Sequence, residues 1–303
     1  MVSMGSLIAE PCEKFDDVIS LSNKFCRRPD KLSCWIFRGQ EDATWSLSTN
    51  IERAIQEFNL PFSKAPDIEL GLLRKFRRHC ENYVANVPDW GNYMEWFALM
   101  RHYGAPTRLL DCTYSFFVAL FFALENADKP FVVWAFNSEA FDRETCHVLG
   151  PKKAVLIKPG PKYDPNLQFP KDFHKIFVSP RKQLVCAMNP YKFNERMVIQ
   201  QGVFLCPGDI TKPFEKNLTN IFKSEKAFNQ NVKKYEFKFS HKLKKEILFY
   251  LQKMNMNRAT LFPGLEGFAE SLRTLLAFPE VTKVLPKDSD YVKKRYSARW
   301  PKP

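Results

Sequence analysis

The chain has 303 residues, of which 45% are apolar and 11 are glycines, so a glycine-rich phosphate loop is not expected. Its formal net charge of +13 divides unevenly, with −4 over residues 1–150 and +17 over residues 151–303. No window approaches the ~18 uncharged apolar residues of a membrane span, and residues 1–12 lack the pattern of a secretory signal. We therefore expect a cytoplasmic protein without a membrane partner.

The first elements in the chain alternate between helical and extended patterns. Apolar residues at helical spacing predict a helix within 10–30, and the run 34–40 predicts a strand that a turn joins to an extended piece at 45–47. Two amphipathic helices are then expected at 67–85 and 92–103.

The middle of the chain predicts a buried core. Residues 107–112 read as extended, and 115–127 form an almost wholly apolar helix, which is typical of a central, buried element. A buried strand is expected at 131–136, followed by an irregular stretch over 137–195 with a weak strand near 154–157.

The last part predicts a strand at 196–206, an edge strand at 235–239, and two closing helices at 244–254 and 264–278. This order lacks the regular strand–helix alternation of a doubly wound sheet. The expected fold is a single mixed α+β domain with central strands and a buried helix.

The eight cysteines are scattered, and no two have C-x-x-C spacing, so no metal site is expected. Cys112 has no neighbouring base that would mark it as a nucleophile, and we interpret it as a core residue. The basic excess of residues 151–303 has two open interpretations. It predicts either a surface for nucleic acid or an acidic protein, or a solvated lysine-rich face.

Four pieces of sequence stand out together, and in this order they resemble the FRG-domain family. They are Phe37-Arg38-Gly39, the run H-Y-G-A-P-T-R-L-L-D over 102–111, Gln200-Gln201-Gly202, and M-N-M-N-R-A-T-L-F-P-G-L over 254–265. The resemblance runs from about Trp35 to about Leu272. It implies an N-terminal helical segment at 1–33, an FRG domain at 34–280 and a basic tail at 281–303.

A more distant likeness concerns the order of polar residues along the strands. Arg38 on a first strand, Thr113 and Ser115 before an apolar helix, and Gln200 or Gln201 at a third strand are similar to the arrangement in ADP-ribosyltransferases. The likeness implies NAD as the substrate. Many members of that superfamily have Glu at the third position, where a carboxylate stabilises an oxocarbenium-like centre better than an amide does, so activity stays open.

The likeness also implies roles for particular residues. The implied catalytic set is Arg38, Thr113, Ser115 and Gln201, and we expect these four to line one cleft. The implied cofactor-binding set is Arg38, Gly39, His102, Tyr103, Arg108 and Asp111.

Each of these residues also has a structural interpretation. Arg38 or Arg108 can pair with Asp111, and Ser115 is a good N-cap for the apolar helix. His102 is either an acid or base oriented by Asp111 or a helix C-terminal residue. These alternatives remain open at the level of sequence.

Two function classes follow. The first is an NAD-dependent ADP-ribosyltransferase-like enzyme, or an NAD-consuming toxin or effector, that acts on nucleic acid or protein. The second is a non-catalytic nucleotide or nucleic-acid binding module. A serine or cysteine hydrolase is a distant third, because the sequence has no nucleophile elbow.

Overall fold

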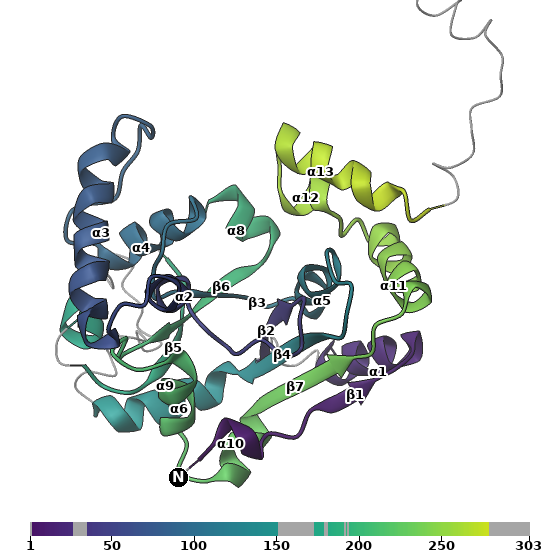
Figure 1. The fold of residues 1–303 in the computed structure, drawn as a ribbon, viewed down its shortest axis with the longest axis horizontal. Helices are drawn as coiled ribbons and strands as arrows, with labels where there is room; N and C mark the ends of the chain where they lie inside the picture. Colours follow the sequence, from purple (N-terminus) through teal and green to yellow (C-terminus); the bar gives the residue numbers. More distant parts are fainter. Residues whose placement is uncertain are drawn as a thin grey trace, which may run out of the picture.

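The computed structural model describes residues 2–26, 35–150, 173–178, 181–190, 192 and 194–278. These residues form one mixed seven-stranded sheet with helices on both faces (Figure 1). Its order is β1-β7-β4-β2-β3-β6-β5, in which β1 runs parallel to β7 and the other neighbours are antiparallel. The strands are β1 (Glu10–Cys12), β2 (Trp35–Gln40), β3 (Leu110–Thr113), β4 (Phe131–Asn137), β5 (Val185–Met188), β6 (Gly202–Pro207) and β7 (Val232–Phe237).

The predicted α+β class with a central buried helix is confirmed. The α-helices are α1 (Phe15–Cys26), α2 (Asn50–Glu57), α3 (Ala65–Cys80), α4 (Tyr93–His102), α5 (Phe116–Leu124), α6 (Ser138–Leu149), α8 (Glu195–Ile199), α9 (Phe214–Asn220), α10 (Glu225–Asn231), α11 (His241–Lys253), α12 (Arg258–Leu261) and α13 (Leu265–Leu275). Shorter turns of helix are η1 (Met4–Ser6), η2 (Phe62–Lys64) and η4 (His174–Val178). None of the helices in these described ranges combines the length and apolar character that a bilayer span needs.

The sheet carries a separate apolar core on each face, because successive side chains of a strand point to opposite sides. Ile36 of β2 and Trp134 of β4 join a core with residues of α3, α4, α6 and α9. The adjacent residues Phe37 and Val133 join a second core with residues of α1, α5 and α11. The buried α5 therefore lies directly against the centre of the sheet.

Gly39 allows the close approach of α5 to β2. A Cβ atom on Gly39 would lie 2.0 Å from the carbonyl oxygen of Ala119 and 2.6 Å from the amide nitrogen of Ala123. Only a residue without a side chain fits there. The helix itself begins at Ser115, whose Oγ accepts a hydrogen bond from the Val118 amide.

Several sequence-based expectations are wrong. Residues 138–149 are not irregular but form α6, whose polar sequence still buries Phe141, Thr145 and Leu149 at four-residue spacing. The predicted strand 196–206 divides into α8, capped by Asn194, and β6. Residues 45–47 are not a strand, and α2, α9 and α10 were not predicted.

The expected edge strand is interior. β7 lies between β1 and β4, and its charged side chains are satisfied locally: Lys234 Nζ donates to the Ala43 carbonyl, and Lys233 pairs with Glu10. β1, in the N-terminal segment expected to be helical, forms that edge of the sheet. The weak strand near 154–157 and the basic tail 281–303 lie outside the described residues.

Candidate functional site

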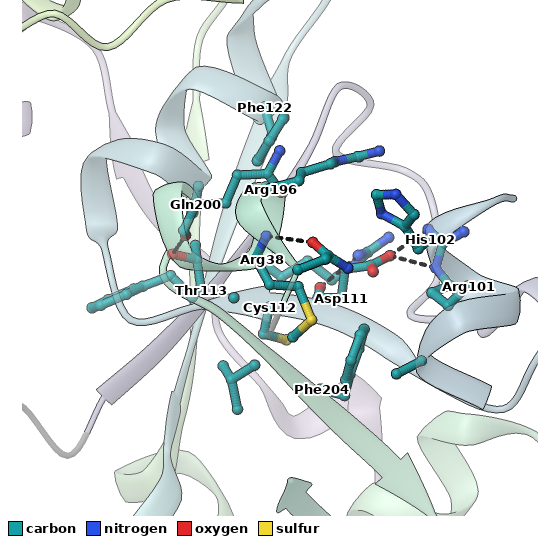
Figure 2. A pocket seen from close by; sticks show the side chains of 18 of the residues that line it. Arg38, Arg101, His102, Asp111, Cys112, Thr113, Phe122, Arg196, Gln200 and Phe204 are labelled. Carbon is teal, nitrogen blue, oxygen red and sulfur yellow. Dashed lines mark hydrogen bonds and ion pairs between the residues drawn. The ribbon is translucent and has the colours of Figure 1, made fainter. Parts of the chain in front are cut away.

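The site lies where two central strands separate. β2 pairs with β4 through six residue pairs but with β3 through one, Phe37 opposite Thr113. Beyond that pair the strands diverge, and a pocket of about 510 Å³ opens among β2, β3, α4, α5, α8, β6 and α12 (Figure 2). Its polar lining comprises Arg38, Arg101, His102, Asp111, Thr113, Asn194, Arg196, Gln200 and Arg258.

Arg38 bridges the separated strands. Its Nη1 donates to the backbone carbonyl of Asp111 at 2.8 Å. Its Nε is buried and has no hydrogen-bond partner among the described residues. Burial lowers the pKa of Arg38, although the Asp111 carboxylate opposes this effect. The half-buried guanidinium thus has no ion-pair partner among the described residues.

The carboxylate of Asp111 is bound by Arg101 and not by Arg38. Arg101 Nε donates to Asp111 Oδ2 at 2.8 Å, and Arg101 Nη2 contacts the same oxygen. His102 lies beside this pair, as Figure 2 shows. Burial lowers the pKa of His102, and the charge of Arg196 adds to this effect. His102 therefore enters the pocket as a neutral imidazole at pH 7.

Two further arginines form the opposite wall. The Cζ atoms of Arg196 and Arg258 lie 4.2 Å and 3.9 Å from the ring centroid of Phe262. Arg258 is neutralised, since Nη1 binds Glu125 at 2.8 Å and Nη2 binds Glu270 at 2.5 Å. Arg196 has no carboxylate partner among the described residues, and burial lowers its pKa.

Hydrogen bonds of Thr113 and Gln200 connect the elements at the end of the pocket beside β3. Thr113 Oγ1 donates to the Gln200 carbonyl at 2.7 Å and accepts from the Ser115 amide at 3.0 Å. Gln200 Nε2 donates to the Leu261 carbonyl at 2.9 Å, which holds α12 against α8. These bonds join the third and fourth signature pieces to the end of β3.

The structure brings together five of the predicted site residues and excludes four. Gly39 and His102 line the pocket together with Arg38, Asp111 and Thr113. The residues placed elsewhere are Ser115, which caps α5; Gln201, exposed with a φ of 49°; Tyr103, 59% exposed; and Arg108.

Arg108 is buried, paired with Glu69 and outside the pocket lining. Its side chain is 1% exposed, and its guanidinium pairs with Glu69, with Nη1 donating to the Phe177 carbonyl. Burial acts to lower the pKa of Arg108, but the Glu69 carboxylate outweighs it and the pKa is raised. Neither proposed arginine–Asp111 ion pair is formed.

Sequence reasoning missed several pocket residues. Arg101 lies directly before the H-Y-G-A-P-T-R-L-L-D run. Arg196 lies in α8, at the start of a segment that was predicted as a strand. Arg258 and Phe262 belong to the fourth signature piece, which was recognised without roles for its residues. The sequence therefore marked that piece as a motif without assigning roles to its residues.

Cysteine and metal chemistry find no support in the geometry. Burial raises the pKa of Cys112 to about 12, so its thiol stays protonated at neutral pH. In the described part of the chain no group of three His, Cys, Asp or Glu side chains is placed to hold a metal ion.

One comparison with known proteins gives a match. Residues 33–131 match the family model of the FRG domain, a span that reaches from β2 to the first residue of β4. No curated protein and no solved structure matches the chain. The matched span contains the F-R-G piece and the H-Y-G-A-P-T-R-L-L-D run, which supply Arg38, His102 and Asp111 to the pocket. The similarity to the FRG domain is therefore shown for residues 33–131.

Proposed function

We propose that the pocket binds a nucleotide or dinucleotide through its phosphate groups, with NAD as the ligand that the likeness to ADP-ribosyltransferases implies. The observation that carries this proposal is the contrast among the four lining arginines. Arg101 and Arg258 have carboxylate partners, whereas Arg38 and Arg196 have none among the described residues. Two unpaired guanidiniums match the two negative charges of a pyrophosphate.

The lining also offers a seat for a flat ring. Phe122 and Phe262 lie 5.8 Å apart, edge to face, and both line the pocket. A base or nicotinamide ring can pack against Phe122, while the volume of about 510 Å³ lies within the range of small-molecule sites. An aromatic ring joined to an anionic group describes a nucleotide better than it describes inorganic phosphate.

ADP-ribosyl transfer is the reaction that we propose to follow the binding of NAD. Arg38, Thr113 and Gln200 line one cavity in the order that the likeness requires, with Gln200 in place of the expected Gln201. In such a transfer the bond between nicotinamide and the ribose C1′ breaks, and nicotinamide leaves with the electron pair. An acceptor oxygen or nitrogen then bonds to C1′ and loses its proton. Asp111, which binds Arg101, is the carboxylate in the lining.

Calorimetric titration with NAD, ADP-ribose and nicotinamide riboside tests the binding proposal. We expect NAD and ADP-ribose to bind, and the riboside, which lacks the pyrophosphate, to bind at least about tenfold more weakly. Arg196→Gln should weaken NAD binding by about 10- to 100-fold, because a charge-assisted hydrogen bond contributes about 1.5–3 kcal/mol. Arg78→Gln, at an exposed position of α3, is the matched control.

Equal affinity for the riboside, or equal loss in the control variant, would refute the phosphate seat. Mass spectrometry for released nicotinamide tests the reaction separately. Binding without release leaves the protein as a binding module, the second function class that the sequence predicts.

A further inference from the structure

The helix α13 packs on the rest of the protein in an unusual orientation. Its buried residues are the small Gly267 and Ser271, and Glu270 ties it to Arg258 of α12. A Cβ atom on Gly267 would lie 1.9 Å from the Phe262 carbonyl oxygen, so the small face is closely packed. The helix is therefore held with a small-residue face inward.

The apolar face of α13 points to solvent. Leu265, Phe268, Leu272 and Leu276 follow one another at spacings of three and four residues, which places them on one side of a helix. They are 81%, 53%, 48% and 66% exposed. A surface helix normally buries such a stripe, and contiguous exposed apolar patches mark interaction sites. In Figure 1, α13 lies at the periphery of the molecule, away from the sheet.

We infer that this stripe is a self-association surface, and that a second copy of the chain covers it through an antiparallel pairing of the two α13 helices. The inference is independent of what the pocket binds. A two-fold axis near residue 270 places Phe268 of one copy against Leu272 of the other. The same axis places Leu265 of one copy against Leu276 of the other, so the two copies of the stripe cover each other along their full length.

The charges beside the stripe favour this direction of pairing. Glu266 and Arg273 lie seven residues apart, hence on the same flank of the helix. In an antiparallel two-fold pair, the same flank of each helix meets with its direction reversed. Glu266 of one copy then faces Arg273 of the other twice, whereas a parallel pairing brings no such match.

The exposed area is of the size that a small dimer interface needs. The smallest standard interfaces bury about 600 Å² on each partner. Four large apolar side chains about half or more exposed, with the adjoining Phe249 at 50% exposure on α11, supply an area of that order. The ring of Phe249 already contacts Phe278, which follows α13 in the chain, so the patch continues from one helix to the other.

Sedimentation velocity of the full chain over about 1 μM to 1 mM tests the inference. The wild-type protein should pass from monomer to dimer in this range, and Phe268→Glu with Leu272→Glu should stay monomeric. Leu60→Glu, at an apolar position 43% exposed after α2, is the matched control and should dimerise as wild type does. Circular dichroism checks that each variant keeps its helical content.

Exchanging the charges of Glu266 and Arg273 tests whether a second copy of the chain covers the stripe. Glu266→Arg and Arg273→Glu should each weaken dimerisation by about two- to tenfold, and the double exchange should restore it, because both charge pairs are rebuilt with reversed sign. A wild-type protein that stays monomeric, or a dimer that the Phe268 and Leu272 changes leave intact, would overturn the inference. Binding of the monomer to vesicles of phosphatidylcholine and phosphatidylserine, lost in Phe268→Glu, would assign the stripe to lipid instead.

Discussion

Two regions of the molecule hold an arginine in opposite ways. Beneath the sheet, Arg108 is 1% exposed and its guanidinium is paired with the Glu69 carboxylate. In the pocket, Arg38 has a backbone carbonyl as its partner and an Nε without one in the described residues. Both arginines belong to conspicuous motifs, and both are desolvated. The two arginines therefore differ in whether they have a carboxylate partner, as Arg108 does in Glu69, and not in whether they belong to a motif.

The largest expected effect comes from breaking the buried ion pair between Arg108 and Glu69. Arg108→Met should lower the free energy of unfolding by about 3–5 kcal/mol, because it leaves the Glu69 carboxylate buried and unpaired. Replacing both residues, Glu69→Met with Arg108→Met, should recover most of the loss. Denaturant unfolding of the three proteins measures this. A double variant as unstable as the single one would mean that the pair itself, and not the orphaned charge, carries the stability.

A second prediction concerns the buried carboxyl group of Glu52. Burial raises the pKa of Glu52 to about 7, although backbone hydrogen bonds from Phe214 and Thr49 oppose this effect. Because the folded pKa exceeds the unfolded value, the stability from this group is full below pH ~4.5 and is lost as the pH rises through about 7. The loss amounts to at most about 3 kcal/mol.

Unfolding of the wild-type protein and of Glu52→Gln across pH 4.5–7.5 checks this sign. The difference between the two proteins should change over that window, in the direction of a relatively more stable wild type at low pH. A constant difference would show that the carboxyl titrates at its ordinary pKa.

The third prediction concerns Arg38 and sharpens the comparison directly. Arg38→Met should change the free energy of unfolding by less than about 1 kcal/mol, because it removes a desolvated cation that has no carboxylate to orphan. The same variant should weaken NAD binding at least about tenfold. Paired melting and titration experiments measure both quantities. A stability loss comparable with that of Arg108→Met would place Arg38 among the structural residues.

The smallest expected effect concerns the basic run of α11. Lys244 Nζ donates to the Ala127 carbonyl and its pKa is lowered by burial, so Lys242 and Lys245 are the exposed members. If residues 151–303 bind duplex DNA, the log–log salt slope should be roughly −5, and Lys242→Glu with Lys245→Glu should reduce its magnitude by about 2. Filter binding over a salt series measures the slope. An unchanged slope would remove α11 from any polyanion surface.

The sequence predicted the elements that have one strong periodic signal. The apolar α5, the strands β2 and β4 and the helix cap at Ser115 follow from local patterns. It failed where tertiary contacts satisfy charged side chains. β7 alternates like an edge strand because Lys233 and Lys234 have partners on neighbouring segments, and α6 is polar because it covers the core with few apolar residues.

The candidate site was predictable as a set of motifs but not as a geometry. The four signature pieces do meet in one pocket, with residues of each in its lining. Which neighbour in a motif faces the cavity depends on strand and turn geometry. Gln200 lies inside and Gln201 outside because Gln201 adopts a left-handed turn conformation. The partners of Arg38, Arg108 and Asp111 depend on side-chain reach across the sheet, which one sequence does not specify.

The glycine of the F-R-G signature, Gly39, controls a distance in the structure. Its missing side chain sets how near α5 stands to β2, and α5 carries Phe122 on the pocket wall and ends at Glu125, the anchor of Arg258. Any larger residue would act as a spacer between strand and helix and displace that wall. Arg38 supplies positive charge to the pocket, and Gly39 sets the distance between β2 and α5 and hence the width of the pocket.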